Sequence, residues 1–82
     1  MSKNDGNVVT RLPHVGQLVR FHAPDFEVSS HYNGSKVHAA IVTRVLGPDC
    51  INVKVIPDCG EIHDRTSVPR AFHGGNPWGF EE

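Results

Sequence analysis

Apolar and polar residues alternate most clearly between residues 37 and 56. Every second residue of this stretch is apolar or β-branched: Val37, Ala39, Ile41, Thr43 and Val45, then Ile51, Val53 and Val55. A Gly-Pro-Asp turn at 47–49 separates the two runs. Because successive side chains of a strand point to opposite faces of a sheet, this pattern predicts a half-buried antiparallel hairpin.

Shorter strands are predicted on both sides of the hairpin. They are 14–21, with Val19 and Phe21 facing the core, 61–65, with Ile62 facing the core, and 68–72. Residues 23–35 hold Pro, Asp, a Ser pair and Asn-Gly, a composition that suits neither a helix nor a continuous strand. We expect them to form a long loop that folds back on the barrel, although Asn-Gly at 33–34 could close a small hairpin.

These elements predict an all-β fold of about five short antiparallel strands. The long first loop and the tight later turns favour a small SH3-like barrel, with an OB-like barrel as the alternative. We expect residues 1–13 to be a flexible arm, 14–73 to be the single barrel domain, and 74–82 to be a Gly/Pro/aromatic tail without a strand. About 60 residues remain to build the core, and a domain of that size is marginally stable alone, so the chain could form a homo-oligomer.

Charge and hydropathy exclude several classes of partner. The chain has eight basic and nine acidic residues, a net charge of −1 and no polybasic run, which disfavours nonspecific nucleic-acid binding. No apolar run approaches the roughly 18 to 20 residues that cross a bilayer, and the first ten residues lack the pattern of a secretion signal, so we expect a cytoplasmic protein. Cys50 and Cys59 match no redox or zinc spacing and are predicted to be free thiols.

Six histidines are many for 82 residues. His22, His31 and His38 bracket the long loop and could meet Asp25 in a divalent-metal site. Known metal-ligand histidines sit at short fixed spacings on regular elements, whereas these do not. We therefore predict solvated histidines, no metal and no cofactor.

Catalytic pairs are weak in this sequence. His63 and Asp64 are adjacent in a predicted strand, so their side chains point to opposite faces and cannot share a proton. Cys59 and His63 form the only pair that resembles a thiol nucleophile and its base, and nothing identifies an oxyanion hole. We predict that the protein is not an enzyme.

Four segments resemble a known group of proteins. They are Gly-Gln-Leu-Val at 16–19, Ala-Ala-Ile-Val-Thr-Arg-Val at 39–45, Val-Lys-Val-Ile-Pro-Asp-Cys-Gly at 53–60 and Pro-Trp at 77–78. The order is similar to that of small uncharacterised bacteriophage and prophage proteins, with a G-x-[VL]-V start, an AAIVTxV strand, a Pro-x-x-Gly exit and a tryptophan-bearing tail. This chain departs from them at Gln17, at Ile56 and in the tail at 78–80. The resemblance implies a phage origin and a small β-barrel, and it implies no activity.

Aromatic and basic residues outside the hairpin form the candidate binding surface. Its members are Arg20, Phe26, Tyr32, Arg65, Arg70, Trp78 and Phe80. In an SH3-like barrel the first long loop and the chain end can lie on one side, where exposed aromatics form a groove for an extended peptide. Tyr, Trp and Arg are also the residues enriched at protein hot spots. Alternatively, Phe26, Trp78 and Phe80 close the ends of the barrel.

We therefore expect a non-catalytic, phage-encoded protein that binds a host or phage protein in the host cytoplasm. One alternative is a binder of a nucleotide signal, in which Arg20, Arg65 or Arg70 holds phosphate and Tyr32 or Trp78 stacks on the base. Another alternative is a small structural component of the virion.

Overall fold

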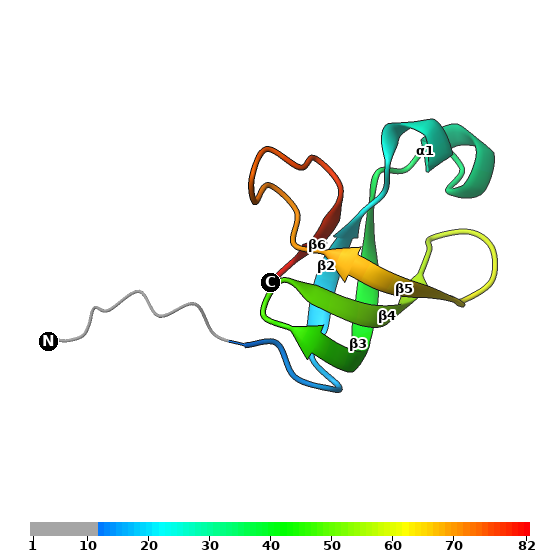
Figure 1. The fold of residues 1–82 in the computed structure, drawn as a ribbon. Helices are drawn as coiled ribbons and strands as arrows, with labels where there is room; N and C mark the ends of the chain where they lie inside the picture. Colours follow the sequence, from blue (N-terminus) through cyan, green and yellow to red (C-terminus); the bar gives the residue numbers. More distant parts are fainter. Residues whose placement is uncertain (1–11) are drawn as a thin grey trace, which may run out of the picture.

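The computed structural model describes residues 12–82, which form a curved β-sheet with one short helix at its end (Figure 1). The arm predicted at 1–13 therefore lies almost wholly outside the described residues. The elements are β2 (Leu18–His22), α1 (Asp25–His31), β3 (Val37–Gly47), β4 (Cys50–Ile56), β5 (His63–Pro69) and β6 (Gly79–Glu81).

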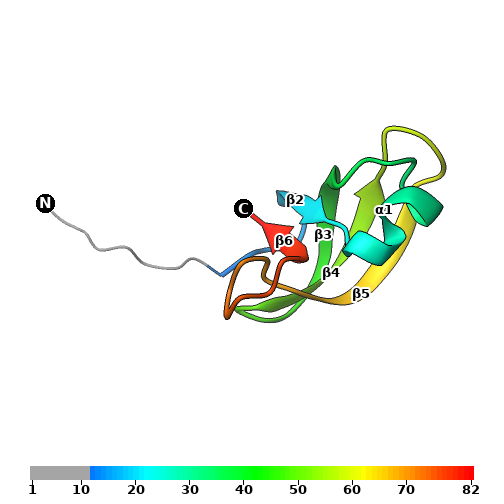
Figure 2. The ribbon, with the colours of Figure 1, turned by 90° about the horizontal axis from the view of Figure 1, so that it is seen from above.

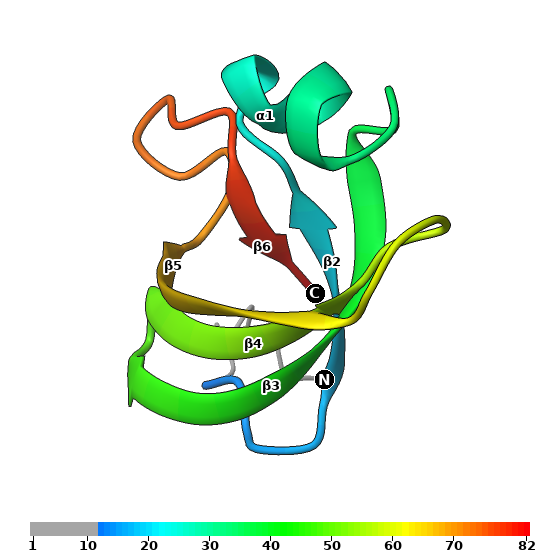
Figure 3. The same ribbon diagram turned by 90° about the vertical axis from the view of Figure 1, so that its right-hand side faces the viewer.

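The five strands form one open sheet in the order β5-β4-β3-β2-β6, and every neighbouring pair is antiparallel. Figure 3 shows the β3–β4 hairpin crossing β2 and β6 at a steep angle, so the sheet is strongly curved. Its ends approach at a parallel bridge between Arg70 and Phe80, where the Ala71 N–H donates to the Phe80 carbonyl over 2.8 Å. The prediction of an all-β fold with about five antiparallel strands is confirmed.

The core lies on the concave face of this sheet. Val19 and Phe21 are buried as predicted. The other buried hydrophobic residues of the central cluster come from β3, β4, β5 and β6 and from the positions that directly follow β2 and α1: Ala23, Tyr32, Ala40, Val42, Ile51, Val53, Val55, Val68 and Phe80. The predicted hairpin is confirmed as β3 and β4, joined by a turn at Pro48 and Asp49.

In β3 the buried side chains are the even-numbered ones, not the β-branched odd-numbered set that marks the strand in the sequence. The register explains this choice. Ala40 pairs with Val55 and Val42 pairs with Val53, and directly opposed residues share a face of the sheet. Because β4 buries both valines, β3 buries their partners. A bulge after Val42 then returns Val45 to the inner side, where it packs against the core.

The edge strand β5 departs from the prediction in two ways. It is one continuous strand, where two short strands were predicted at 61–65 and 68–72. Ile62, expected to face the core, precedes the strand and is 59% exposed. His63 and Arg65 face inward instead, because they pair with buried valines of β4. Inward-pointing polar side chains are a common feature of edge strands.

The prediction that 23–35 contains no helix is wrong. α1 begins with Asp25 and Glu27 in its first turn, where negative charge complements the helix dipole. Residues 33 and 34 adopt φ of 54° and 82° and end the helix, with the Gly34 N–H donating to the Val28 carbonyl over 2.9 Å. Asn-Gly therefore terminates a helix here and does not close a hairpin. Figures 1 and 2 both place α1 at one end of the sheet.

The tail at 74–82 contains a strand that the sequence did not predict. β6 pairs with β2 and places Phe80 opposite Phe21 in the core. Gly79 makes this possible, because its φ is +131° and a Cβ there would lie 2.1 Å from the Pro69 carbonyl oxygen. The tail is thus part of the sheet.

Candidate functional site

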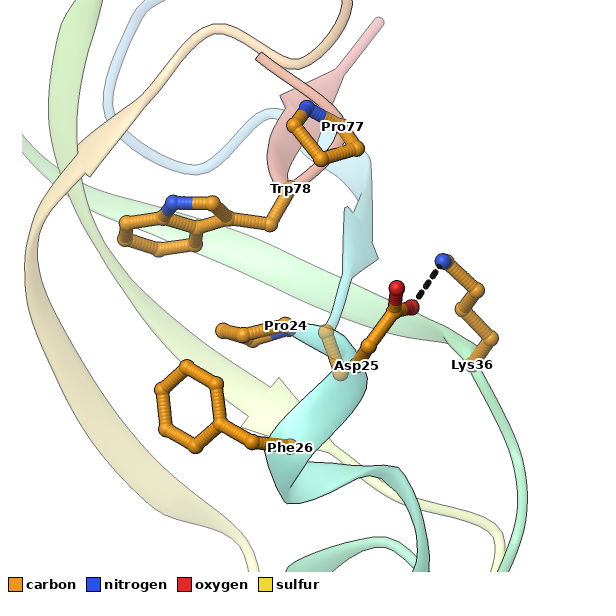
Figure 4. A pocket seen from close by; sticks show the side chains of 7 residues that line it. Pro24, Asp25, Phe26, Lys36, Pro77 and Trp78 are labelled. Atoms are coloured by element: carbon orange, nitrogen blue, oxygen red, sulfur yellow. Dashed lines mark hydrogen bonds and ion pairs between the residues drawn. The ribbon is translucent and has the colours of Figure 1, made fainter.

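A cleft of about 240 Å³ lies between the start of α1 and the segment that leads into β6. We call it the aromatic cleft and define it by its lining residues, Ala23, Pro24, Asp25, Phe26, Lys36, Pro77 and Trp78. Figure 4 shows the rings of Phe26 and Trp78 on either side of Pro24, all directed to one side. On the other side the Lys36 ammonium donates to the Asp25 carboxylate over 2.5 Å.

Phe26 is the most unusual member of the cleft, because its side chain is 80% exposed. α1 buries none of its residues, so nothing in the packing of the helix requires a phenyl group at this position. A large exposed aromatic beside a half-buried tryptophan is typical of a surface that contacts another molecule.

Trp78 is held in place from two directions. The Asn76 side-chain amide donates to the Trp78 carbonyl over 2.9 Å, and the Arg65 guanidinium carbon lies 6.0 Å from the indole ring centroid. Among residues 12–82, the indole Nε1–H donates to no protein acceptor. The aromatic cleft therefore combines apolar rings with an unused hydrogen-bond donor.

Arg65 connects the sheet, the helix and the cleft. Its Nη1 donates to the Glu27 carboxylate and, over 3.1 Å, to the Tyr32 hydroxyl. Its guanidinium carbon also lies 5.2 Å from the Phe21 ring centroid. Because Glu27 and Tyr32 lie within and directly after α1, this one side chain fixes the helix against β5 and supports Trp78.

The electrostatics of this contact follow from burial and pairing. Burial raises the pKa of the Tyr32 phenol above its ordinary value, and the nearby Arg65 charge offsets only part of that rise. Burial by itself lowers the pKa of Arg65, but the hydrogen bond to Glu27 and the Tyr32 and Glu27 charges outweigh it, so that pKa is raised. The guanidinium therefore stays charged at any pH at which the protein is folded.

The structure separates the residues of the predicted binding surface. Phe26 and Trp78 line the aromatic cleft, and Arg65 supports it. Tyr32 and Phe80 are 1% and 0% exposed, so the expectation that they form an exposed groove is wrong. Both were misassigned because they lie outside the strongly alternating segments, yet tertiary packing places them in the core.

The remaining arginines lie elsewhere and are engaged by other carboxylates. Arg20 Nε lies 3.5 Å from Glu81 Oε1. Arg70 binds Asp49 and Glu82, and its guanidinium carbon lies 4.7 Å from the centroid of the Phe80 ring. Arg20, Arg65 and Arg70 thus bind three separate sets of carboxylates. This arrangement differs from the convergent arginines that a phosphate-binding pocket would need.

Sequence reasoning missed Pro24 and Pro77, which complete the walls of the cleft, and Glu27, which anchors Arg65. The only signal for the two prolines was that each lies close in the chain to an aromatic residue.

The histidines are also placed differently from the prediction. His22 and His38 are buried rather than solvated, with 9% and 4% exposure. His22 Nε2 lies 2.8 Å from Glu81, whereas Asp25 pairs with Lys36, so the residues considered for a metal site point to different partners. Within residues 12–82, no three His, Cys, Asp or Glu side chains gather in a way that could hold a metal ion.

Asp64 forms an outer-face ion pair with Lys54, on the opposite side of β5 from His63, as the strand geometry predicted. Cys50 and Cys59 are free thiols, as predicted.

Comparisons with protein-family models, with curated proteins and with solved structures gave no match in any of the three. In the part of the chain from residue 12 onward, no helix is long and apolar enough to cross a bilayer.

Proposed function

We propose that this protein is a non-enzymatic, phage-encoded interaction module that binds an extended, proline-containing segment of a host or phage protein in the aromatic cleft. The observation that carries the proposal is the 80% exposed Phe26 beside Trp78, across a wall made by Pro24. The phage origin and the host cytoplasm as the place of action rest on the resemblance of residues 16–80 to small phage proteins.

The chemistry of the cleft supports this class of ligand. Flat aromatic rings separated by a proline ring provide a ridged apolar surface that matches the rings of a polyproline II segment. Such a segment has no internal hydrogen bonds, so its carbonyls are available to accept from the unused Trp78 Nε1–H. Its extended conformation is largely preformed, so little conformational entropy is lost when it binds.

The architecture supports the finer description of the fold as an SH3-like barrel. The first strand, β2, lies between β3 and β6, and the long connection that carries α1 joins β2 to β3. In such a barrel the first loop and the segment before the last strand lie close together. Those two segments line the aromatic cleft.

Trp78 provides the test, because it is the only tryptophan in the chain. An array of short synthetic peptides with two prolines is titrated into the protein while its fluorescence is recorded, and each peptide has a counterpart with alanine in place of proline. We expect saturable changes in emission with members of the proline set and none with their counterparts.

Phe26→Ala and Phe72→Ala form a matched pair of variants for this test. Both remove an exposed phenyl ring, but Phe72 packs on His22, outside the aromatic cleft. We expect Phe26→Ala to weaken binding about tenfold or more and Phe72→Ala to leave it unchanged. An array without any binding peptide, or equal losses in the two variants, would contradict the proposal.

A further inference from the structure

Three of the six histidines surround the single tyrosine. The ring centroids of His38, His63 and His31 lie 4.6, 5.5 and 6.5 Å from that of Tyr32. They come from three elements: His31 from α1, His38 from β3 and His63 from β5. Tyr32 directly follows α1 and is 1% exposed, so it is the side chain that buries the end of the helix in the core.

The hydrogen bonds around Tyr32 select one tautomer of a neutral His63 ring. Arg65 can only donate, so the Tyr32 oxygen accepts from it. The Glu61 carbonyl can only accept, so a neutral His63 ring carries its hydrogen on Nδ1 and donates it to that carbonyl over 3.0 Å. Nε2 is then unprotonated and accepts the Tyr32 hydroxyl hydrogen, also over 3.0 Å. Neutral His63, in this one tautomer, completes the chain of donors.

A proton added to His63 breaks this chain. Nε2 becomes a donor that faces a hydroxyl already bonded to Arg65, and the buried Tyr32 hydrogen loses its acceptor. The new imidazolium also shares that hydroxyl with the Arg65 guanidinium. The other charged or titratable groups around it are Glu27 and His31 from α1, His38 from β3, and Cys59 and Glu61 from the connection before β5.

Of the two carboxylates, Glu27 is already bound to Arg65. Glu61 contacts the His63 ring through its backbone carbonyl. Within residues 12–82, neither carboxylate forms an ion pair with the His63 ring.

We propose that His63 is an acid-sensitive latch for α1: its protonation releases Tyr32 and with it the end of the helix from the sheet. Arg65 contacts both Tyr32 and Trp78, so release of the latch also alters the aromatic cleft. The effect on ligand binding rests on the proposed function, whereas the latch itself does not. Histidine is suited to this role because unperturbed imidazoles take up a proton near pH 6.5, within the range in which proteins stay folded.

The test uses the full chain and two readouts that need no ligand. Ring ¹⁵N chemical shifts at about pH 8, where imidazole is neutral, should show the hydrogen of His63 on Nδ1. Trp78 emission should then change between about pH 7.5 and pH 5. His63→Gln removes the titrating group and keeps a side-chain acceptor for Tyr32, so it should abolish this change. His14→Gln, an exposed histidine outside the cluster, should retain it.

A hydrogen on Nε2 of His63 would overturn the proposal, and so would emission that stays constant to pH 5 or an unaltered transition in His63→Gln. The ¹⁵N measurement on the parent protein stands even if the variant fails to fold. Peptide titrations at both ends of the pH range separate the two proposals. A latch transition without peptide binding at any pH would remove the proposed function and leave the latch in place.

Discussion

The contact that fixes α1 to the sheet can be tested by Arg65→Met, which keeps the length of the side chain and removes its charge. The variant loses the hydrogen bonds to Glu27 and Tyr32 and the stacking on Phe21. The Arg65 and Glu27 side chains of the ion pair are 24% and 14% exposed. The cost of breaking this pair should therefore lie between that of a surface pair, at most about 1 kcal/mol, and that of a buried pair, about 3–5 kcal/mol. With about 0.5–1 kcal/mol from stacking, we expect a loss of about 3 kcal/mol in the free energy of unfolding.

Urea unfolding at about pH 8, where imidazoles are neutral, measures this loss when it is followed by far-ultraviolet circular dichroism. Lys54→Met is the matched control, because it removes only an exposed ion pair with Asp64 and should cost less than about 1 kcal/mol. The double variant Glu27→Gln/Arg65→Met should be more stable than the sum of the single effects predicts, by about 1.5–3 kcal/mol. Additive effects, or equal losses in Arg65→Met and Lys54→Met, would refute this account of how α1 is held.

Three further outcomes follow from the packing and electrostatics. Gly79→Ala should prevent folding or destabilise the protein severely, since its Cβ would meet a carbonyl oxygen at 2.1 Å. Gly75→Ala has open space around it and should lower the free energy of unfolding, measured by thermal unfolding, by only the roughly 1–2 kcal/mol that a left-handed backbone costs. Ile51→Ala should lower the free energy of unfolding by about 2–5 kcal/mol because the residue is fully buried, while the exposed Ile62→Ala should change it by less than about 0.5 kcal/mol in the same urea series. Because the pKa of Tyr32 is raised on folding, its contribution to stability is present below about pH 10 and is lost as the pH rises further. Ultraviolet absorbance of the phenolate, which this single tyrosine alone can form, should therefore appear together with alkaline unfolding and not before it.

The local periodicity of the chain was sufficient to predict β2, β3 and β4 and the turn between the last two. It also identified Val19 and Phe21 as core residues, because alternation within one strand is a local property. It was insufficient at α1 and β6. Seven residues of helix and three residues of strand are too short to carry a periodic pattern, and contacts to Arg65 and to β2 hold them in place.

The candidate site was predictable only in part, for the same reason. Phe26 and Trp78 stood out as aromatic residues in segments without a strand pattern, and both line the aromatic cleft. Tyr32 and Phe80 had the same local signature but are buried, because burial depends on which distant strands pack against a segment.

The sequence by itself determined the fold class, the position of the hairpin and the absence of a polybasic or bilayer-length run, since each depends on the order of residues over a short window. Only the tertiary structure decided which face of β3 is buried, because that choice follows from register with β4. It also decided that His63 and Arg65 turn inward to meet Tyr32, which lies about 30 residues away along the chain. Those pairings form by closure of long loops, whose partners no local pattern specifies.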